Sequence, residues 1–351
     1  MSARLRIRAL LWFIVAAVYY IVARGIASVA AGGLSSGIWF DFVDRAILLF
    51  LLIVGYAAMG YVGQRQQNPI RTMGLARRAG AGREFALGAA IGWTGMAAIA
   101  LIIAMFGGLV IFFYTNWRQF AEIPLDLAIL LIAALAEEVA FRGYPFQRLI
   151  EATGPLFATF FLSILYALVH ITNSGASPAS FIVAMLAGWV FSIAYLRTRG
   201  LWVSWGIHFA WNASMAVLFG LPLMGLTRFS PVISSTALGP TWLTGFDYGP
   251  EGSAIAIVVM LGLIALTLYA TRNLSWRYVQ PAAVPAGSSA DILAPEPPRS
   301  EPIITPPPAT APPVETPVEP PVSESPQPSE PANPASDEPT STPKGPAGTA
   351  E

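Results

Sequence analysis

Eight long apolar stretches constrain this 351-residue chain more than any other feature of its sequence. A helix of about 20 apolar residues is long enough to cross the hydrocarbon core of a bilayer, which is roughly 30 Å thick. Only 11% of the residues are charged and 55% are hydrophobic, whereas a soluble domain carries about 25% charged residues. The sequence therefore predicts an all-α fold, a polytopic membrane bundle of about eight transmembrane helices. The expected spans are residues 8–30, 45–63, 86–113, 125–150, 155–173, 179–196, 201–220 and 253–271.

The arginines indicate how these spans are oriented. If the N-terminus is cytoplasmic, 14 of the 18 arginines before residue 281 lie on the inner side, as the positive-inside rule requires. The N-terminal stretch also resembles a signal peptide, but its apolar run is long, so we expect a retained helix. Lys344 is the only lysine, and such a preference for arginine is typical of a high-GC bacterium. We expect a multi-pass protein of the bacterial plasma (inner) membrane with both termini cytoplasmic.

The composition changes abruptly after residue 280. Residues 281–351 hold 21 of the 30 prolines and carry little that could be buried. Such a Pro/Glu/Ser/Thr-rich segment is predicted to be a disordered cytoplasmic tail. It is expected to act as a spacer, and binding of an unidentified partner to its proline runs is left open.

Charged residues interrupt the fourth apolar stretch. Glu137, Glu138 and Arg142 lie where ionisable side chains cost roughly 2.5–3.5 kcal/mol each on insertion scales and by default indicate a functional site. Glu138 and Arg142 are four residues apart and share a helix face. Glu137 points about 100° away from Glu138. We therefore expect one carboxylate to face a cavity and the other to pair with Arg142.

The only two histidines lie in other apolar stretches. His170 follows Tyr166 by four residues, and His208 precedes Asn212 by four, so each pair shares a helix face. If the fourth, fifth and seventh spans are neighbours, these groups converge with the Glu137 region. A carboxylate can activate water, an imidazole can assist, and an amide can stabilise an oxyanion.

Other interpretations of these residues stay open at this stage. Glu137, His170 and His208 could hold a zinc ion, although each histidine is on a different helix and no zincin motif is present. The charges could be a buried ion pair that only joins helices, or a proton path in a transporter. Three serines, Ser163, Ser204 and Ser214, lie in these spans, but none is singled out as a nucleophile. The absence of cysteine excludes thiolate chemistry.

Together these residues resemble the CPBP family, which contains CAAX prenyl proteases and bacteriocin-processing intramembrane proteases. Its three motifs are Glu-Glu-x-x-x-Arg, Phe-x-x-x-His and His-x-x-x-Asn or Asp. The first is matched in full at residues 137–142. Tyr166 replaces the phenylalanine of the second before His170, and His208 with Asn212 matches the third. The motif core covers about residues 125–220.

The resemblance implies that residues 1–280 form a transmembrane protease domain. It implies Glu137 as the carboxylate that activates water, His170 as its assistant, and His208 with Asn212 as oxyanion stabilisers, or His208 as a further metal ligand. Glu138, Arg142 and Tyr166 would support them. The chain is expected to be an intramembrane endopeptidase that acts on a membrane protein or peptide in the lipid bilayer. Catalysis with a divalent metal and catalysis without one are both left open. The alternative is a non-hydrolytic immunity or scaffold protein on the same fold. No nucleic-acid partner is expected.

Overall fold

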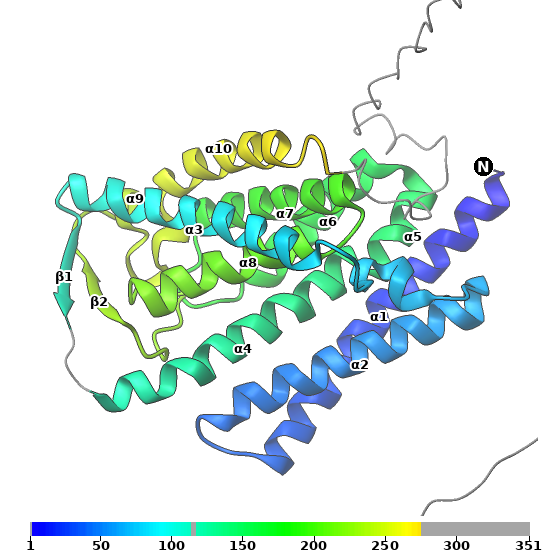
Figure 1. The fold of residues 1–351 in the computed structure, drawn as a ribbon, viewed down its shortest axis with the longest axis horizontal. Coiled ribbons are helices and arrows are strands. Elements are labelled where there is room, and N and C mark those ends of the chain that lie inside the picture. Colours follow the sequence, from blue (N-terminus) through cyan, green and yellow to red (C-terminus); the bar gives the residue numbers. More distant parts are fainter. Residues whose placement is uncertain (1, 114–116, 275–351) are drawn as a thin grey trace, which may run out of the picture. The chain divides into compact units, whose positions relative to one another are not determined.

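The computed structural model describes residues 2–113 and 117–274. Helices dominate these residues, together with short 3₁₀ and π-helical segments (Figure 1). The α-helices are α1 (Ala3–Leu34), α2 (Trp39–Gln64), α3 (Ala81–Met105), α4 (Trp117–Arg142), α5 (Tyr144–Thr153), α6 (Pro155–His170), α7 (Pro178–Thr198), α8 (Trp202–Ala213), α9 (Thr241–Thr244) and α10 (Ala254–Ala270). The π-helices are η1 (Arg71–Leu75) and η2 (Ser214–Leu218), and the 3₁₀-helices are η3 (Phe246–Tyr248) and η4 (Pro250–Gly252). The predicted tail, residues 281–351, lies outside the described part of the chain.

Within the described part of the chain, four helices are long and apolar enough to cross a membrane, namely α1, α2, α3 and α7. Two shorter apolar helices, α6 and α10, fall within two further predicted spans. The protein is therefore a mostly helical, multi-pass membrane protein. The count of eight spans stays a prediction, because α8 is short and the fourth stretch forms two helices.

The fourth stretch is divided at Gly143. Helix α4 ends at Arg142 and α5 begins at Tyr144, so the expected continuous span 125–150 is wrong. A Cβ at Gly143 would lie 2.4 Å from the carbonyl oxygen of Val139, so a larger residue here would have to displace the backbone of α4. Pro145 lies in the first turn of α5, where proline is tolerated, and it begins a helix rather than kinking one. Arg142 thus becomes the last residue of α4.

A small β-sheet is the second difference from the expected fold, which contained helices alone. Strand β1 (Leu109–Phe113) pairs antiparallel with β2 (Ile233–Ala237), with Ile111 opposite Ser235. The expected span 86–113 therefore ends early, at Met105, because Gly107 has a positive φ of 72° and the chain turns into a strand. β2 belongs to the segment between η2 and α10. The sheet therefore attaches this segment to the end of α3.

Helix α4 occupies a central place in the bundle. It packs against α2 on one side and against α8 on the other, as Figure 1 shows. α6 packs on α7, and α7 in turn contacts both α8 and α10. The motif-bearing helices α4, α6 and α8 are therefore held close together, and α7 connects α6 to the other two.

Helices α3 and α8 approach one another through glycines. A Cβ at Gly88 would lie 2.1 Å from the carbonyl oxygen of Val203, and one at Gly92 would lie 2.2 Å from that of Ile207. On the other helix, a Cβ at Gly206 would lie 2.2 Å from the carbonyl oxygen of Phe85. Small residues of this kind let backbones pack closely in membranes. Because His208 follows Ile207, this contact also fixes the depth of His208.

Substitution of Gly92 tests that packing. Gly92→Ala should lower the free energy of unfolding by about 1–3 kcal/mol, because the methyl group overpacks a contact between backbones. Thermal unfolding in detergent would measure the loss. Gly262→Ala is the matched control, since Gly262 lies in α10 with nothing within 4 Å of its Cβ position. Equal melting temperatures for the two variants would contradict the close approach.

Candidate active site

Glu138 is the buried carboxylate of the site. Its side chain is fully buried, and its Oε1 atom lies 3.0 Å from Nδ1 of His208 and 3.5 Å from Nη1 of Arg142. The pair with Arg142 spans one turn of α4, as its four-residue spacing predicts. A buried charge is tolerated only with such partners. Glu138 therefore joins α4 to α8.

Arg142 is held from several directions. Its Nη2 atom donates to the backbone carbonyl of Gly188 in α7 at 3.2 Å. Its guanidinium carbon lies 4.9 Å from the ring centroid of Tyr166 and 5.0 Å from that of Phe191. A planar guanidinium suits this combination of ring stacking and hydrogen bonding, and lysine does not. Arg142 thus connects the end of α4 to both α6 and α7.

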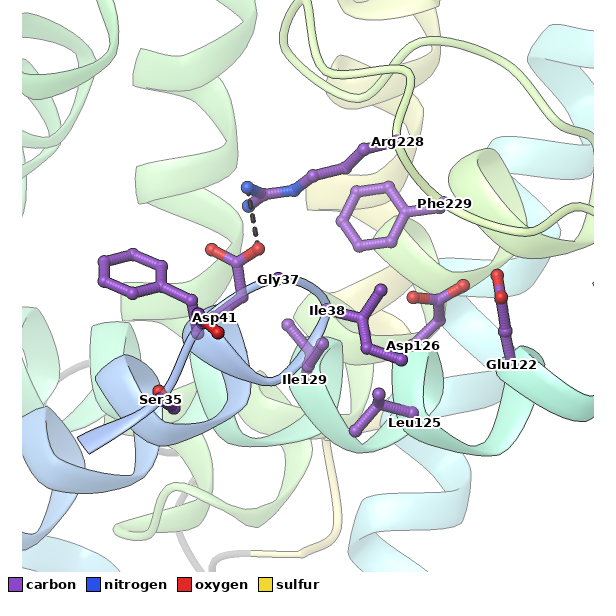
Figure 2. A pocket seen from close by; sticks show the side chains of 12 residues that line it. Ser35, Gly37, Ile38, Asp41, Glu122, Leu125, Asp126, Ile129, Arg228 and Phe229 are labelled. Carbon is purple, nitrogen blue, oxygen red and sulfur yellow. Dashed lines mark ion pairs between the residues drawn. The ribbon is translucent and has the colours of Figure 1, made fainter. Parts of the chain in front are cut away.

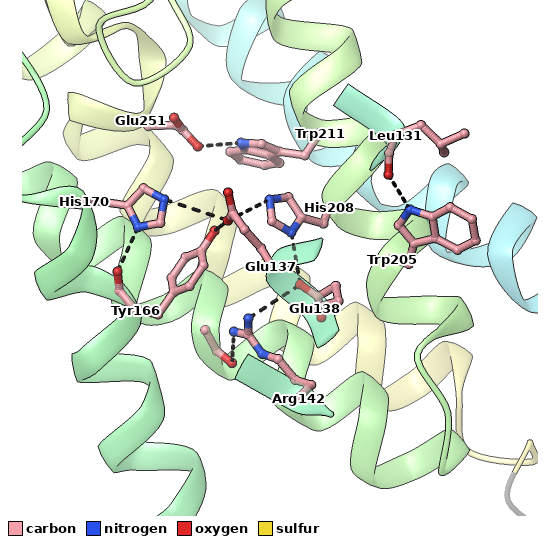
Figure 3. Close-up of polar contacts among 11 residues, drawn as sticks. Leu131, Glu137, Glu138, Arg142, Tyr166, His170, Trp205, His208, Trp211 and Glu251 are labelled. Carbon is pink, nitrogen blue, oxygen red and sulfur yellow. Dashed lines mark hydrogen bonds and ion pairs between the residues drawn. The ribbon is translucent and has the colours of Figure 1, made fainter. Parts of the chain in front are cut away.

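Glu137 points the other way, as expected from a 100° step between neighbours. Its Oε2 atom lies 3.7 Å from Nε2 of His208 and 3.9 Å from Nε2 of His170, as Figure 3 shows. The hydroxyl of Tyr166 donates to the same oxygen at 3.3 Å. The side chain of Glu137 is 27% exposed, against 0% for Glu138. The two adjacent carboxylates therefore differ in access to water.

Both imidazoles direct Nε2 toward Glu137 because Nδ1 is occupied. Nδ1 of His170 lies 2.8 Å from the carbonyl oxygen of Tyr166, and Nδ1 of His208 faces Glu138. A backbone carbonyl accepts only, so Nδ1 of His170 carries the proton and a neutral His170 has a free lone pair at Nε2. The ring of His208 also stacks on Phe191, with centroids 4.8 Å apart and planes 13° apart. The orientation of both rings is thus set by their neighbours.

Asn212 lies on the same face of α8 as His208 and is 6% exposed. Its Oδ1 atom has no hydrogen-bond partner among the described residues. Asn212 lines a cavity of about 20 Å³ together with His208, Tyr166 and Trp211. The structure therefore brings all seven residues expected from the sequence to one region, joined by direct contacts except at Asn212.

Two of the three serines in these spans, Ser163 and Ser204, form no hydrogen bond with this cluster. Ser204 donates its hydroxyl to the carbonyl oxygen of Leu201 at 3.1 Å, within its own helix. Ser163 packs against the backbone position of Gly188. Neither arrangement activates a hydroxyl through histidine.

Donor chemistry and donor spacing point in different directions for a metal. The Nδ1 contacts of both histidines are of the kind that orient metal-binding imidazoles. Within residues 2–113 and 117–274, however, no group of three or more His, Cys, Asp or Glu residues is arranged to hold a metal ion. A zinc ligand set needs bonds of about 2.0–2.2 Å to each donor. A metal ion held by Glu137, His170 and His208 therefore stays a prediction from the sequence.

The structure also shows contacts that the sequence did not single out. Trp211 donates its Nε1 hydrogen to Oε1 of Glu251 at 2.9 Å. Phe191 supports both His208 and Arg142. Glu251 follows Trp211 by forty residues, and no spacing rule connects them. Tyr166 was the one supporting aromatic residue that the sequence motif could indicate.

A larger cavity, of about 610 Å³, lies away from the histidines (Figure 2). It is formed by the turn between α1 and α2, the first half of α4 and the segment around Arg228. Arg228 pairs with Asp41 across it at 2.8 Å. Glu122 and Asp126 both accept hydrogen bonds from Ser230. These contacts attach the segment before β2 to α2 and α4.

Comparison with known families places these residues in context. Residues 117–214 match the family model described as type II CAAX prenyl endopeptidase Rce1-like. This segment of the chain is therefore similar to that family of endopeptidases. All seven motif residues, from Glu137 to Asn212, lie inside the matched segment. The match covers less than a third of the chain. No curated protein and no solved structure matches the chain.

Substitution of Arg142 tests how this residue supports the site. Arg142→Ala should lower the free energy of unfolding by roughly 3–5 kcal/mol, because it leaves the charge of Glu138 buried without its cation. Arg142→Lys should restore only part of this stability, since an ammonium cannot reproduce the planar contacts. Thermal unfolding in detergent measures both effects. Arg228→Ala is the control, because an exposed pair contributes only about 0–1 kcal/mol; equal losses at the two sites would contradict the support role of Arg142.

Proposed function

We propose that this protein is an intramembrane endopeptidase that hydrolyses peptide bonds of membrane-associated proteins or peptides with a water activated by Glu137. The single observation that supports it most is the placement of Nε2 of both histidines around one oxygen of a partly exposed carboxylate. Separations of 3.7 and 3.9 Å are too long for direct hydrogen bonds, and polar contacts of this length are often bridged by water.

The roles follow from which atoms can accept or donate a proton. Glu137 takes one proton from the water as its oxygen attacks the carbonyl carbon of the scissile peptide. His170, with a lone pair at Nε2, accepts the second hydrogen of that water and so orients it. The new C–O bond leaves negative charge on the former carbonyl oxygen. Glu137 then returns its proton to the nitrogen as the C–N bond breaks.

The charge on the oxyanion needs donors. His208 directs Nε2 toward Glu137, and an N–H at that nitrogen is one such donor. The amide group of Asn212 offers further N–H donors one turn along the same helix face. Donors of this kind act most strongly where water is excluded. The hydroxyl of Tyr166 keeps Glu137 directed toward the histidines.

Glu137→Gln tests the water-activating role. This variant should lose cleavage of a membrane peptide in liposomes, because an amide cannot take the proton of water, while its melting temperature stays near that of the wild type. Glu122→Gln is the matched control, since Glu122 lies on the same helix but lines the larger cavity, away from the histidines. Retention of cleavage by Glu137→Gln would sink this mechanism.

The oxyanion role is tested separately. Asn212→Ala should lower kcat by about 10²–10³-fold, the usual effect of removing one oxyanion donor, with a small change in KM. If His208→Ala abolishes cleavage and Asn212→Ala leaves kcat unchanged, the amide is not an oxyanion donor. Kinetics on a single fluorogenic membrane peptide give both values.

A chelator series addresses the metal question. Under the proposed mechanism, dialysis against a strong chelator should leave cleavage by the purified protein unchanged. Loss of cleavage that zinc restores, with stoichiometric metal by elemental analysis, would replace the metal-free mechanism with a metal-assisted one on the same residues.

A further inference from the structure

A second buried carboxylate lies beside the proposed active site, outside the segment that matches the family. Glu251 belongs to η4, between the strand β2 and α10, and is 6% exposed. Its Oε1 atom accepts a hydrogen bond from Nε1 of Trp211 in α8. Its Oε2 atom has no hydrogen-bond partner among the described residues. A buried carboxylate oxygen without a partner is costly to keep, which points to a role.

Glu251 and Asn212 share one cavity. Both line the space of about 20 Å³ that also touches His208, Tyr248 and Ser180. Each presents a buried oxygen without a partner, Oε2 in Glu251 and Oδ1 in Asn212. A buried water needs about 10–15 Å³ and two to four polar partners. The cavity therefore has the volume and the acceptors for about one water molecule.

The local fold holds Glu251 firmly in this place. Ser253 caps α10 by accepting from the amide of Ala256 at 3.1 Å, so the helix begins directly after η4. A tight turn with positive φ at Met224 and Gly225 packs against η4, and the backbone amide of Met224 interacts with the Glu251 carboxylate. A Cβ at Gly225 would lie 2.5 Å from the carbonyl oxygen of Ser174. The segment before α10 is thus packed onto the loop between α6 and α7.

Burial also raises the pKa of Glu251 to about 7, with Trp211 and His208 opposing the increase. Other titratable groups that interact with it are Glu137 of α4, Tyr166 of α6 and Tyr248 of η3. The raised pKa means that the ionised carboxylate lowers the stability of the folded protein. That cost is absent below the ordinary pKa of 4.5 and complete above about 7.

We propose that Glu251 is a positioning residue of the site, which fixes the His208–Asn212 face of α8 through Trp211 and, with Asn212, holds one buried water beside His208. The proposal rests on the proposed hydrolytic function. The nearby water would complete the hydrogen bonds of the amide of Asn212 and so fix its orientation toward the oxyanion. A purely structural carboxylate would instead stabilise the fold.

Glu251→Gln separates these two roles. It keeps an acceptor for Trp211 and removes the charge, so its melting temperature should exceed that of the wild type by a margin that grows from pH 5 to pH 8. Its kcat should fall by about 10–100-fold with KM little changed, as expected when a catalytic group is slightly misplaced. Asp247→Asn is the matched control, because Asp247 is an exposed acid of the same segment. Loss of both stability and activity at pH 8, or unchanged kcat, would overturn the proposal.

A spectroscopic readout does not depend on activity. In ¹⁵N-tryptophan-labelled protein, the indole resonance that disappears in Trp211→Phe belongs to Trp211. In the wild type it should shift with a midpoint near pH 7, and in Glu251→Gln it should not titrate. A resonance independent of pH in the wild type would refute the contact. A wild type that shows this titration but cleaves no membrane peptide would overturn the proposed function instead.

A high-resolution structure provides the direct test of the water. Density for one water within hydrogen-bond distance of Oε2 of Glu251 and of the side-chain amide of Asn212 would support the proposal. A dry cavity, or a direct hydrogen bond between the two side chains, would overturn the water-binding part.

Discussion

The buried charge of Glu138 is the constraint on which the rest of the site depends. A carboxylate that is completely removed from water must be paired, or it destabilises the fold by several kcal/mol or more. Its partners come from its own helix through Arg142 and from α8 through His208. Arg142 in turn contacts the backbone of α7 at Gly188 and the ring of Phe191. One buried charge thus fixes how α4, α7 and α8 meet.

That arrangement leaves Glu137 free for chemistry. Because neighbouring residues of a helix point about 100° apart, pairing of Glu138 within the bundle turns Glu137 toward the histidines and partial exposure. Tyr166 then bridges the two halves of the site, since its ring lies against Arg142 and its hydroxyl donates to Glu137. The support of the site and the proposed reactive group are therefore adjacent residues with different surroundings.

Helix packing and the segment before α10 add constraints that are remote in sequence. Glycines on α3 and α8 bring the backbones close enough to fix the depth of His208. The tight turn at Met224 and the cap at Ser253 place Glu251 behind Trp211. The surroundings of the site thus include residues outside the segment that matches the family model.

The sequence by itself determined the membrane class, the motif residues and the divergence of Glu137 from Glu138, because hydropathy and helical periodicity act over short distances along the chain. It also favoured the pairing of Glu138 with Arg142, which depends only on a four-residue spacing. Only the tertiary structure decided that α4 ends at Arg142, that residues 109–113 form a strand, and that Glu251 reaches Trp211. These features depend on close backbone contacts and on pairings across tens of residues, for which a linear sequence carries no spacing rule. From the sequence, two histidines on separate helices could be proposed as partners of one carboxylate. The distances between them were decided by the packing of α4 against its neighbours.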